Sequence, residues 1–138
     1  MRFDLGPSLA GVKQQLLAQV DAEAETARLR FITPGAGQAL EYEATERQAR
    51  AYLAAGSPEP FEPAVYPFIE AERQAVFTAI GTLPSPADIV ASVIDSAEAW
   101  MTIGAEIKRL RRSAKIAIEA AETTQAARAA AVVAWPAP

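Results

Sequence analysis

Five positively charged side chains lie close together near the C-terminal end of the sequence, namely Lys108, Arg109, Arg111, Arg112 and Lys115. A cluster of this density could bind phosphate groups or an acidic protein. On a helix, however, these positions cover more than half of the circumference, so they form no single basic face. They also lie near the end of a long predicted helix, where the helix dipole favours cations. A solvated helix face is the simplest interpretation, and an acidic protein partner or a nucleic acid are the alternatives.

Carboxylates could perform acid–base chemistry or bind a metal ion. They occur in two groups, Asp21, Glu23 and Glu25 in the first and Glu41, Glu43 and Glu46 in the second. Residues two apart on a helix point to different sides, so neither group should converge on one ion or substrate. Within the second group, Glu43 with Arg47 and Glu46 with Arg50 have the spacing of stabilising helical ion pairs. Both groups therefore predict solvated helix faces.

The sequence contains no cysteine and no histidine. These absences exclude disulfides, thiolate catalysis, histidine-based acid–base chemistry and most zinc or haem sites. The remaining ionisable and hydroxyl side chains form no recognisable catalytic arrangement. We therefore expect no enzymatic activity, no metal and no cofactor.

Two further segments could bind a ligand or a partner. The loop Thr33–Gln38 contains two glycines before a predicted helix, as a phosphate-binding loop does, but it lacks the spacing and the Gly-Lys-Ser/Thr of a Walker loop. A turn between two helices is the better interpretation. Near the C-terminus, Trp135 precedes Pro136. This tryptophan is either a staple against the helices or an exposed anchor for a partner, because tryptophan is enriched in interface hot spots.

The elements that position these residues are predicted to be helices. Alanine supplies 32 of the 138 residues, and only 7% are aromatic. Alanine favours helices because it loses no side-chain entropy there, but it builds thin cores. Apolar residues recur at steps of three or four over about residues 8–31, 38–55 and 65–80. The all-α class follows from these patterns.

The strongest helical pattern begins after Ser85, which is placed to cap a helix that starts with Pro86. Its apolar stripe continues for roughly 35 residues, or about 50 Å, with Gly104 as a place where it could bend. The stripe consists of Ile89, Val90, Val93, Ile94, Ala97, Trp100, Met101, Ile103, Ile107, Leu110, Ala114, Ile118 and Ala121. A short final helix is expected over residues 125–133, after Thr123 and Thr124. A stripe this long needs partners, either within the chain or in other copies of it.

Prolines divide the predicted helices into two hairpins. Residues 57–64 contain three prolines and predict an extended linker. The expected parts are an N-terminal hairpin (1–56), this linker, and a C-terminal hairpin with the long helix and the Trp-Pro tail (65–138), or one domain made of all three. The formal charge of −4 divides almost evenly, since residues 1–69 hold 6 basic and 9 acidic side chains and residues 70–138 hold 7 and 8. The acidic pI of about 4.9 argues against nucleic acid as the main partner.

Several strings resemble small proteins encoded in the tail and tail-fibre region of tailed bacteriophages. The resemblance spans about residues 8–136. Its main strings are Arg28–Gln38 followed by Tyr42, Tyr66–Ile69, Ala97–Trp100, Ile107 with Arg111 and Lys115, Ile118–Ala121, Thr123–Thr124 and Trp135–Pro136. It implies no cofactor and no catalytic residues. It implies either a structural component of the virion tail, baseplate or fibre attachment, or a tail-fibre assembly chaperone absent from the finished particle.

The expected function is therefore protein–protein contact in phage tail or tail-fibre assembly, with other tail or fibre proteins as partners and self-association as an option. The expected partner-binding residues are Trp135 in the C-terminal tail and five basic residues on the exposed side of the long helix. These five are Lys108, Arg109, Arg111, Arg112 and Lys115. A small DNA-binding regulator that uses the basic residues is the alternative from another class. No apolar stretch approaches the ~20 residues that span a bilayer. We expect synthesis in the host cytoplasm, with the virion as a second location.

Overall fold

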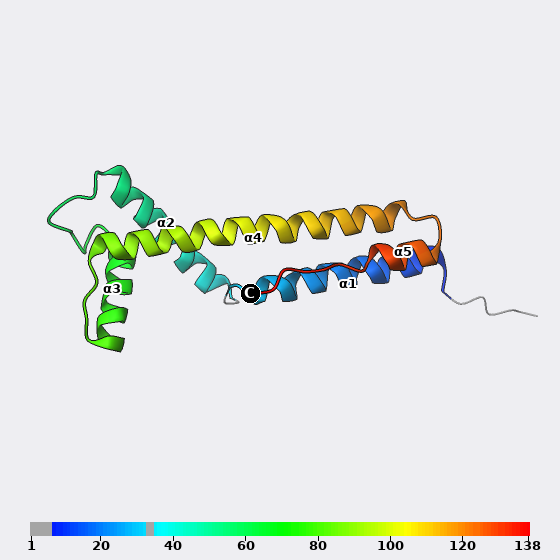
Figure 1. Cartoon of the computed structure of the whole chain (residues 1–138), viewed down its shortest axis with the longest axis horizontal. Coiled ribbons are helices and arrows are strands. Elements are labelled where there is room, and N and C mark those ends of the chain that lie inside the picture. Colours follow the sequence, from blue (N-terminus) through cyan, green and yellow to red (C-terminus); the bar gives the residue numbers. More distant parts are fainter. Residues whose placement is uncertain (1–6, 33–34) are drawn as a thin grey trace, which may run out of the picture. The chain divides into compact units, whose positions relative to one another are not determined.

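The computed structural model describes residues 7–32 and 35–138, and every regular element within these ranges is a helix (Figure 1). The all-α class predicted from the sequence is thus confirmed. The helices are α1 (Leu9–Leu29), α2 (Ala36–Ala54), α3 (Pro67–Ile80), α4 (Pro86–Ala120) and α5 (Thr124–Ala130). Each begins and ends within a few residues of the predicted range. Among the described residues, no helix is both long and apolar enough to cross a membrane.

Local side chains set these helix ends. Ser8, Ser85 and Thr123 each accept a hydrogen bond from a backbone N–H three residues later, at 3.1, 3.1 and 3.0 Å. Such caps satisfy amide groups that have no partner within the helix. α3 ends at Gly81, which adopts a left-handed conformation (φ 77°) that residues with a side chain rarely adopt. α4 continues through Gly104 without interruption.

The contacts divide the chain into two compact units, and this division differs from the predicted hairpins. Unit 1 combines residues 1–32, as far as they are described, with 102–138, and unit 2 comprises residues 33–101. α1 therefore packs with α5 and the C-terminal part of α4 rather than with α2. The proline-rich segment 57–64, predicted as a linker between two parts, lies inside unit 2 and forms no helix.

In unit 1, the C-terminal part of α4 runs antiparallel to α1. Val12, Leu16 and Val20 of α1 form a core with Ala114 and Ile118 of α4, and α5 adds Ala127 with the following Ala131. A second small core joins Ala24 and Ala27 of α1 to Ile107 of α4. These alanines are fully buried, so their small side chains let the neighbouring segments approach closely.

In unit 2, α2 and α3 pack with the beginning of α4. Their core contains six buried residues, Ala49, Tyr52, Tyr66, Ile69, Ile89 and Val90. Three aromatic rings hold the proline-rich segment against it, because Tyr52 lies edge-on to both Phe61 and Tyr66, at centroid distances of 6.1 and 5.5 Å. Gln48 accepts a 2.8 Å hydrogen bond from the backbone N–H of Phe68 and so joins α2 to the first turn of α3.

Met101 lies on the predicted apolar stripe of α4 and is expected to be buried, but 63% of its surface is exposed. The core of unit 2 reaches only to Ile94 along α4, and the cores of unit 1 begin at Ile103. The apolar stripe is thus continuous along α4, whereas the residues of α4 that pack in a core form separate groups, one in each unit.

Candidate functional site

Two of the five basic residues expected to bind a partner are engaged inside unit 1. Arg111 and Lys115 of α4 both bind the carboxylate of Asp21 on α1, with shortest N–O distances of 3.3 and 2.9 Å. The hydrogen bond from Lys115 is the main cause that lowers the pKa of Asp21, and the bond from Arg111 and both positive charges act in the same direction. Arg111 and Lys115 therefore join α4 to α1.

The other three basic residues are exposed, and one of them has a local partner. Arg109 forms a two-pronged contact with Glu106 one turn earlier, at 2.6 and 2.9 Å. This hydrogen bonding lowers the pKa of Glu106 and raises that of Arg109. Lys108 and Arg112 form no ion pair with any residue that the structure describes. Of the predicted cluster, these two cations have the freest side chains for binding a partner.

Trp135 is a staple of unit 1 rather than a fully exposed anchor. Its indole Nε1–H donates a 2.9 Å hydrogen bond to Glu23 on α1, and its ring packs against the core of Ala24, Ala27 and Ile107. Arg30 donates to the backbone carbonyl of the next residue, Pro136, at 3.3 Å. These contacts hold the C-terminal tail along α1, so the stapling alternative describes this residue.

The predicted carboxylate groups have structural roles. Asp21 binds Arg111 and Lys115, Glu23 accepts from Trp135, and Glu25 forms an ion pair with Arg28. Sequence reasoning missed the first two roles because their partners are 90 or more residues away along the chain, whereas Glu46 with Arg50 forms the predicted local pair at 2.9 Å. Within residues 7–32 and 35–138, no group of three or more acidic side chains could hold a metal ion.

The glycine loop before α2 lies only partly within the described residues. Thr33 and Pro34 fall outside them, and Gly35 occupies the N-cap position of α2 with φ 121°. No side-chain cap accompanies it. The described part of the loop thus starts a helix after a glycine, in agreement with a turn between helices.

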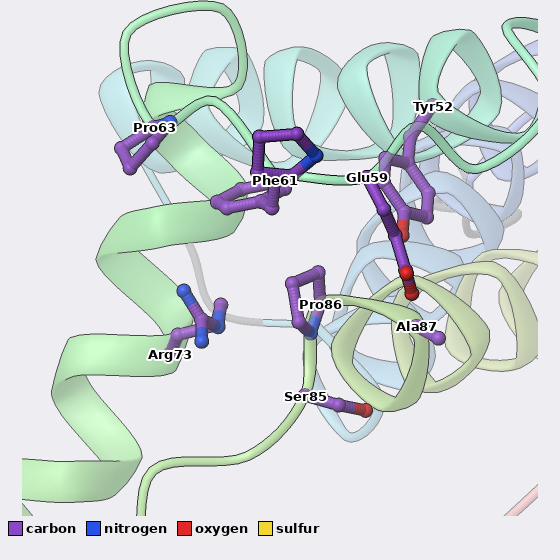
Figure 2. Close-up of a pocket in the computed structure, with 9 residues that line it drawn as sticks. Tyr52, Glu59, Phe61, Pro63, Arg73, Ser85, Pro86 and Ala87 are labelled. Carbon is purple, nitrogen blue, oxygen red and sulfur yellow. The ribbon is translucent and has the colours of Figure 1, made fainter.

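Unit 2 contains a shallow cleft of about 380 Å³ beside the proline-rich segment (Figure 2). Its lining includes Tyr52, Glu59, Phe61 and Arg73, together with the first residues of α4. The Arg73 guanidinium lies over the Phe61 ring, 5.2 Å from its centroid. Sequence reasoning did not single out this cleft, and only the aromatic residues near the prolines could have indicated it.

The polar groups of Arg73 are largely used within unit 2. Its Nε–H donates to the carbonyl of Pro84 at 3.0 Å, and Nη1 binds Glu70 at 2.7 Å. Hydrogen bonds from Gln74, chiefly, and from Arg73 lower the pKa of Glu70. Arg73 thus fastens the segment before α4 and the Phe61 ring to α3, and the cleft is mainly a structural junction.

The C-terminal end of α3 presents a largely uncovered apolar surface of unit 2. Ile69 is fully buried and Val76 packs on the same core, whereas Ile80, one further turn along the same side, is 72% exposed. Phe77, three residues before Ile80 and therefore its neighbour on the helix, is 47% exposed. Leu83 in the following loop is 44% exposed. We call Phe77, Ile80 and Leu83 the α3 apolar end.

No family model, curated protein or solved structure matches the chain. The surfaces described above and the resemblance of its sequence strings are therefore the basis for a functional proposal.

Proposed function

We propose that the protein is a non-catalytic component of a bacteriophage tail or tail fibre that acts by binding other phage proteins. The phage setting rests on the resemblance of strings such as Arg28–Gln38 and Trp135–Pro136, which extends over most of the chain. The mode of action rests on the α3 apolar end. The structural role in the virion is the primary form of the proposal, and the assembly chaperone is its alternative.

The α3 apolar end supports binding because it continues a stripe that is buried elsewhere. The same side of α3 that places Ile69 and Val76 in the core of unit 2 presents Ile80 on the surface. Adjacent exposed apolar side chains mark contact surfaces more often than scattered single ones do. A partner helix or loop that covered Phe77, Ile80 and Leu83 would extend the core of unit 2 by one layer.

Mass spectrometry of purified virions tests the structural role. The proposal expects the protein in the particle at a fixed ratio to known tail or fibre proteins. Its absence from the particle, together with co-purification with unassembled fibre protein, would replace the structural role by the chaperone role. Absence from both would contradict the proposal in either form.

A matched pair of substitutions tests the surface itself. Ile80→Ser removes an exposed apolar side chain at the α3 apolar end, and Val132→Ser removes one that is 83% exposed in unit 1. Both variants should fold, because neither side chain lies in a core. Capture of tail or fibre proteins from infected cells should fall at least about tenfold for Ile80→Ser, since a few kcal/mol of apolar contact is at stake, and remain unchanged for Val132→Ser. Equal capture by both variants would exclude this surface.

A further inference from the structure

The two units carry opposite net charges, a feature hidden when the sequence is divided into halves. The described residues of unit 1 contain nine Lys or Arg and six Asp or Glu, which gives +3. Those of unit 2 contain three Arg and ten Asp or Glu, which gives −7. Charge of this size and opposite sign guides association between surfaces.

In unit 2, internal ion pairs leave most of the acidic surplus on the surface. Arg50 and Arg73 are bound to Glu46 and Glu70. Asp88 and Asp95 of α4 are exposed and form no ion pair with a described residue. They are seven residues apart and therefore lie on the same side of the helix. We call them the acidic pair.

In unit 1, the two cations of α4 that form no ion pair with a described residue share one side of that helix. Lys108 and Arg112 are four residues apart, and the exposed Ile116 follows at the same spacing. Ile107, Ala114 and Ile118 bury the other side of the helix in the cores of unit 1. Lys108, Arg112 and Ile116 therefore form an outward stripe with two free charges and an apolar end, which we call the basic stripe.

From this distribution we infer that the basic stripe of one copy binds the acidic pair of unit 2 in a second copy of the same chain. A second copy fits because every copy carries both a basic stripe and an acidic pair, and the two surfaces are complementary in charge. A nucleic acid fits less well, because the chain as a whole carries −4 and unit 2 would repel phosphates. The inference is independent of the proposed function, since it uses α4 and leaves the α3 apolar end open.

Sedimentation of the full chain at two salt concentrations tests the association. At about 0.02 M salt the mass should correspond to two or more chains, and at about 0.5 M salt to one, because salt screens exposed charges over a few ångströms. A mass of one chain at low salt and high protein concentration would overturn the inference. So would an oligomer whose dissociation constant does not change with salt.

Two variants of equal charge separate the basic stripe from net charge alone. Lys108→Gln with Arg112→Gln removes two positive charges from the stripe, and Gln14→Glu with Gln15→Glu lowers the charge of unit 1 by the same amount on exposed positions of α1. At about 0.1 M salt, where the Debye length is about 10 Å, the first variant should weaken self-association at least about tenfold and the second much less, because charges near the contact dominate. An equal effect of both variants would contradict a specific stripe.

A charge exchange identifies the acidic pair as the other side of the contact. Lys108→Glu with Arg112→Glu in one chain, and Asp88→Lys with Asp95→Lys in another, should each abolish self-association while keeping the helical circular dichroism. Mixing the two variants should restore a complex that contains both chains. Failure of the mixture to associate would overturn the pairing. If the wild-type protein stayed monomeric and bound duplex DNA, and if Lys108→Gln with Arg112→Gln abolished that binding, the basic stripe would be a nucleic-acid site instead.

Discussion

Asp21 is the most connected carboxylate among the predicted acidic residues. Its carboxylate accepts hydrogen bonds from Lys115 and Arg111 of α4, and these contacts lower the pKa of Asp21 below the ordinary value of 3.8. Its side chain is still 47% exposed, so solvent screens the two ion pairs. Asp21 therefore contributes to the register of α1 against α4 more than to the total stability.

The stability that Asp21 contributes should depend on pH in a defined direction. Because folding lowers the pKa of Asp21, its contribution is complete above the unfolded value and is lost as the pH falls through the lower folded value. Asp21→Asn should lower the free energy of unfolding by about 0.5–1 kcal/mol at pH 7, and by less below pH 3.8. Urea titrations at pH 7 and pH 3 measure this difference.

Glu119→Gln provides the control for Asp21, because toward the residues that the structure describes Glu119 contributes only its backbone carbonyl, which accepts from Lys13 at 2.8 Å. This variant should match the wild-type protein at both pH values. A deficit for Asp21→Asn that stays the same at pH 3 would show that the contact acts by packing and not by charge.

Trp135 should stabilise unit 1 through both its ring and its indole N–H. Trp135→Ala should lower the free energy of unfolding by about 2 kcal/mol, less than for a fully buried tryptophan because the ring is only half-buried. Trp135→Phe keeps apolar contact but loses the hydrogen bond to Glu23, and should cost about 1 kcal/mol. Chemical unfolding measures both values. If Trp135→Ala changed neither stability nor partner binding, the residue would have neither predicted role.

At the scale of the element, helix ends were predictable and helix partners were not. The signals for α4 lie next to each other in the sequence, with Ser85 capping the helix and Pro86 in its first turn. The partner of α1 depends on residues far along the chain, as the Asp21–Lys115 contact shows across 94 positions. Helical periodicity indicates which side of α1 is apolar, but several other helices also have an apolar side. Periodicity therefore does not identify the helix that packs against α1.

The alanines of α1 provide a test of how closely its neighbours approach. Ala24 is fully buried, whereas Ala22, two residues earlier, is exposed on the same helix. Ala24→Leu should destabilise unit 1 by about 1–3 kcal/mol, because a filled core has no room for three added carbon atoms. Ala22→Leu should change the stability by less than about 0.5 kcal/mol. Thermal or urea unfolding of the pair compares the two sites, and equal effects would contradict the close approach.

At the scale of the whole molecule, the division into units changes how the charge and the candidate site are understood. The sequence halves differ by only two charges, but units assembled from both ends of the chain differ by ten. Because Asp21 binds Lys115 and Arg111, Lys108 and Arg112 are the exposed members of the cluster without an ion pair to a described residue. The sequence thus identified the basic residues as a group, and long-range contacts selected which of them remain available.

Because the two units have separate cores, a substitution in one core should first destabilise the unit that contains it. Ile69 in unit 2 and Ile118 in unit 1 are both fully buried. Truncation of either to alanine should cost about 2–5 kcal/mol, since it leaves a cavity. In hydrogen exchange resolved by peptide, Ile69→Ala should mainly lower the protection of α2 and α3, and Ile118→Ala that of α1 and α5. Equal loss in all four helices for both variants would show that the cores unfold as one cooperative unit, because amides in one unit would then open only with the other.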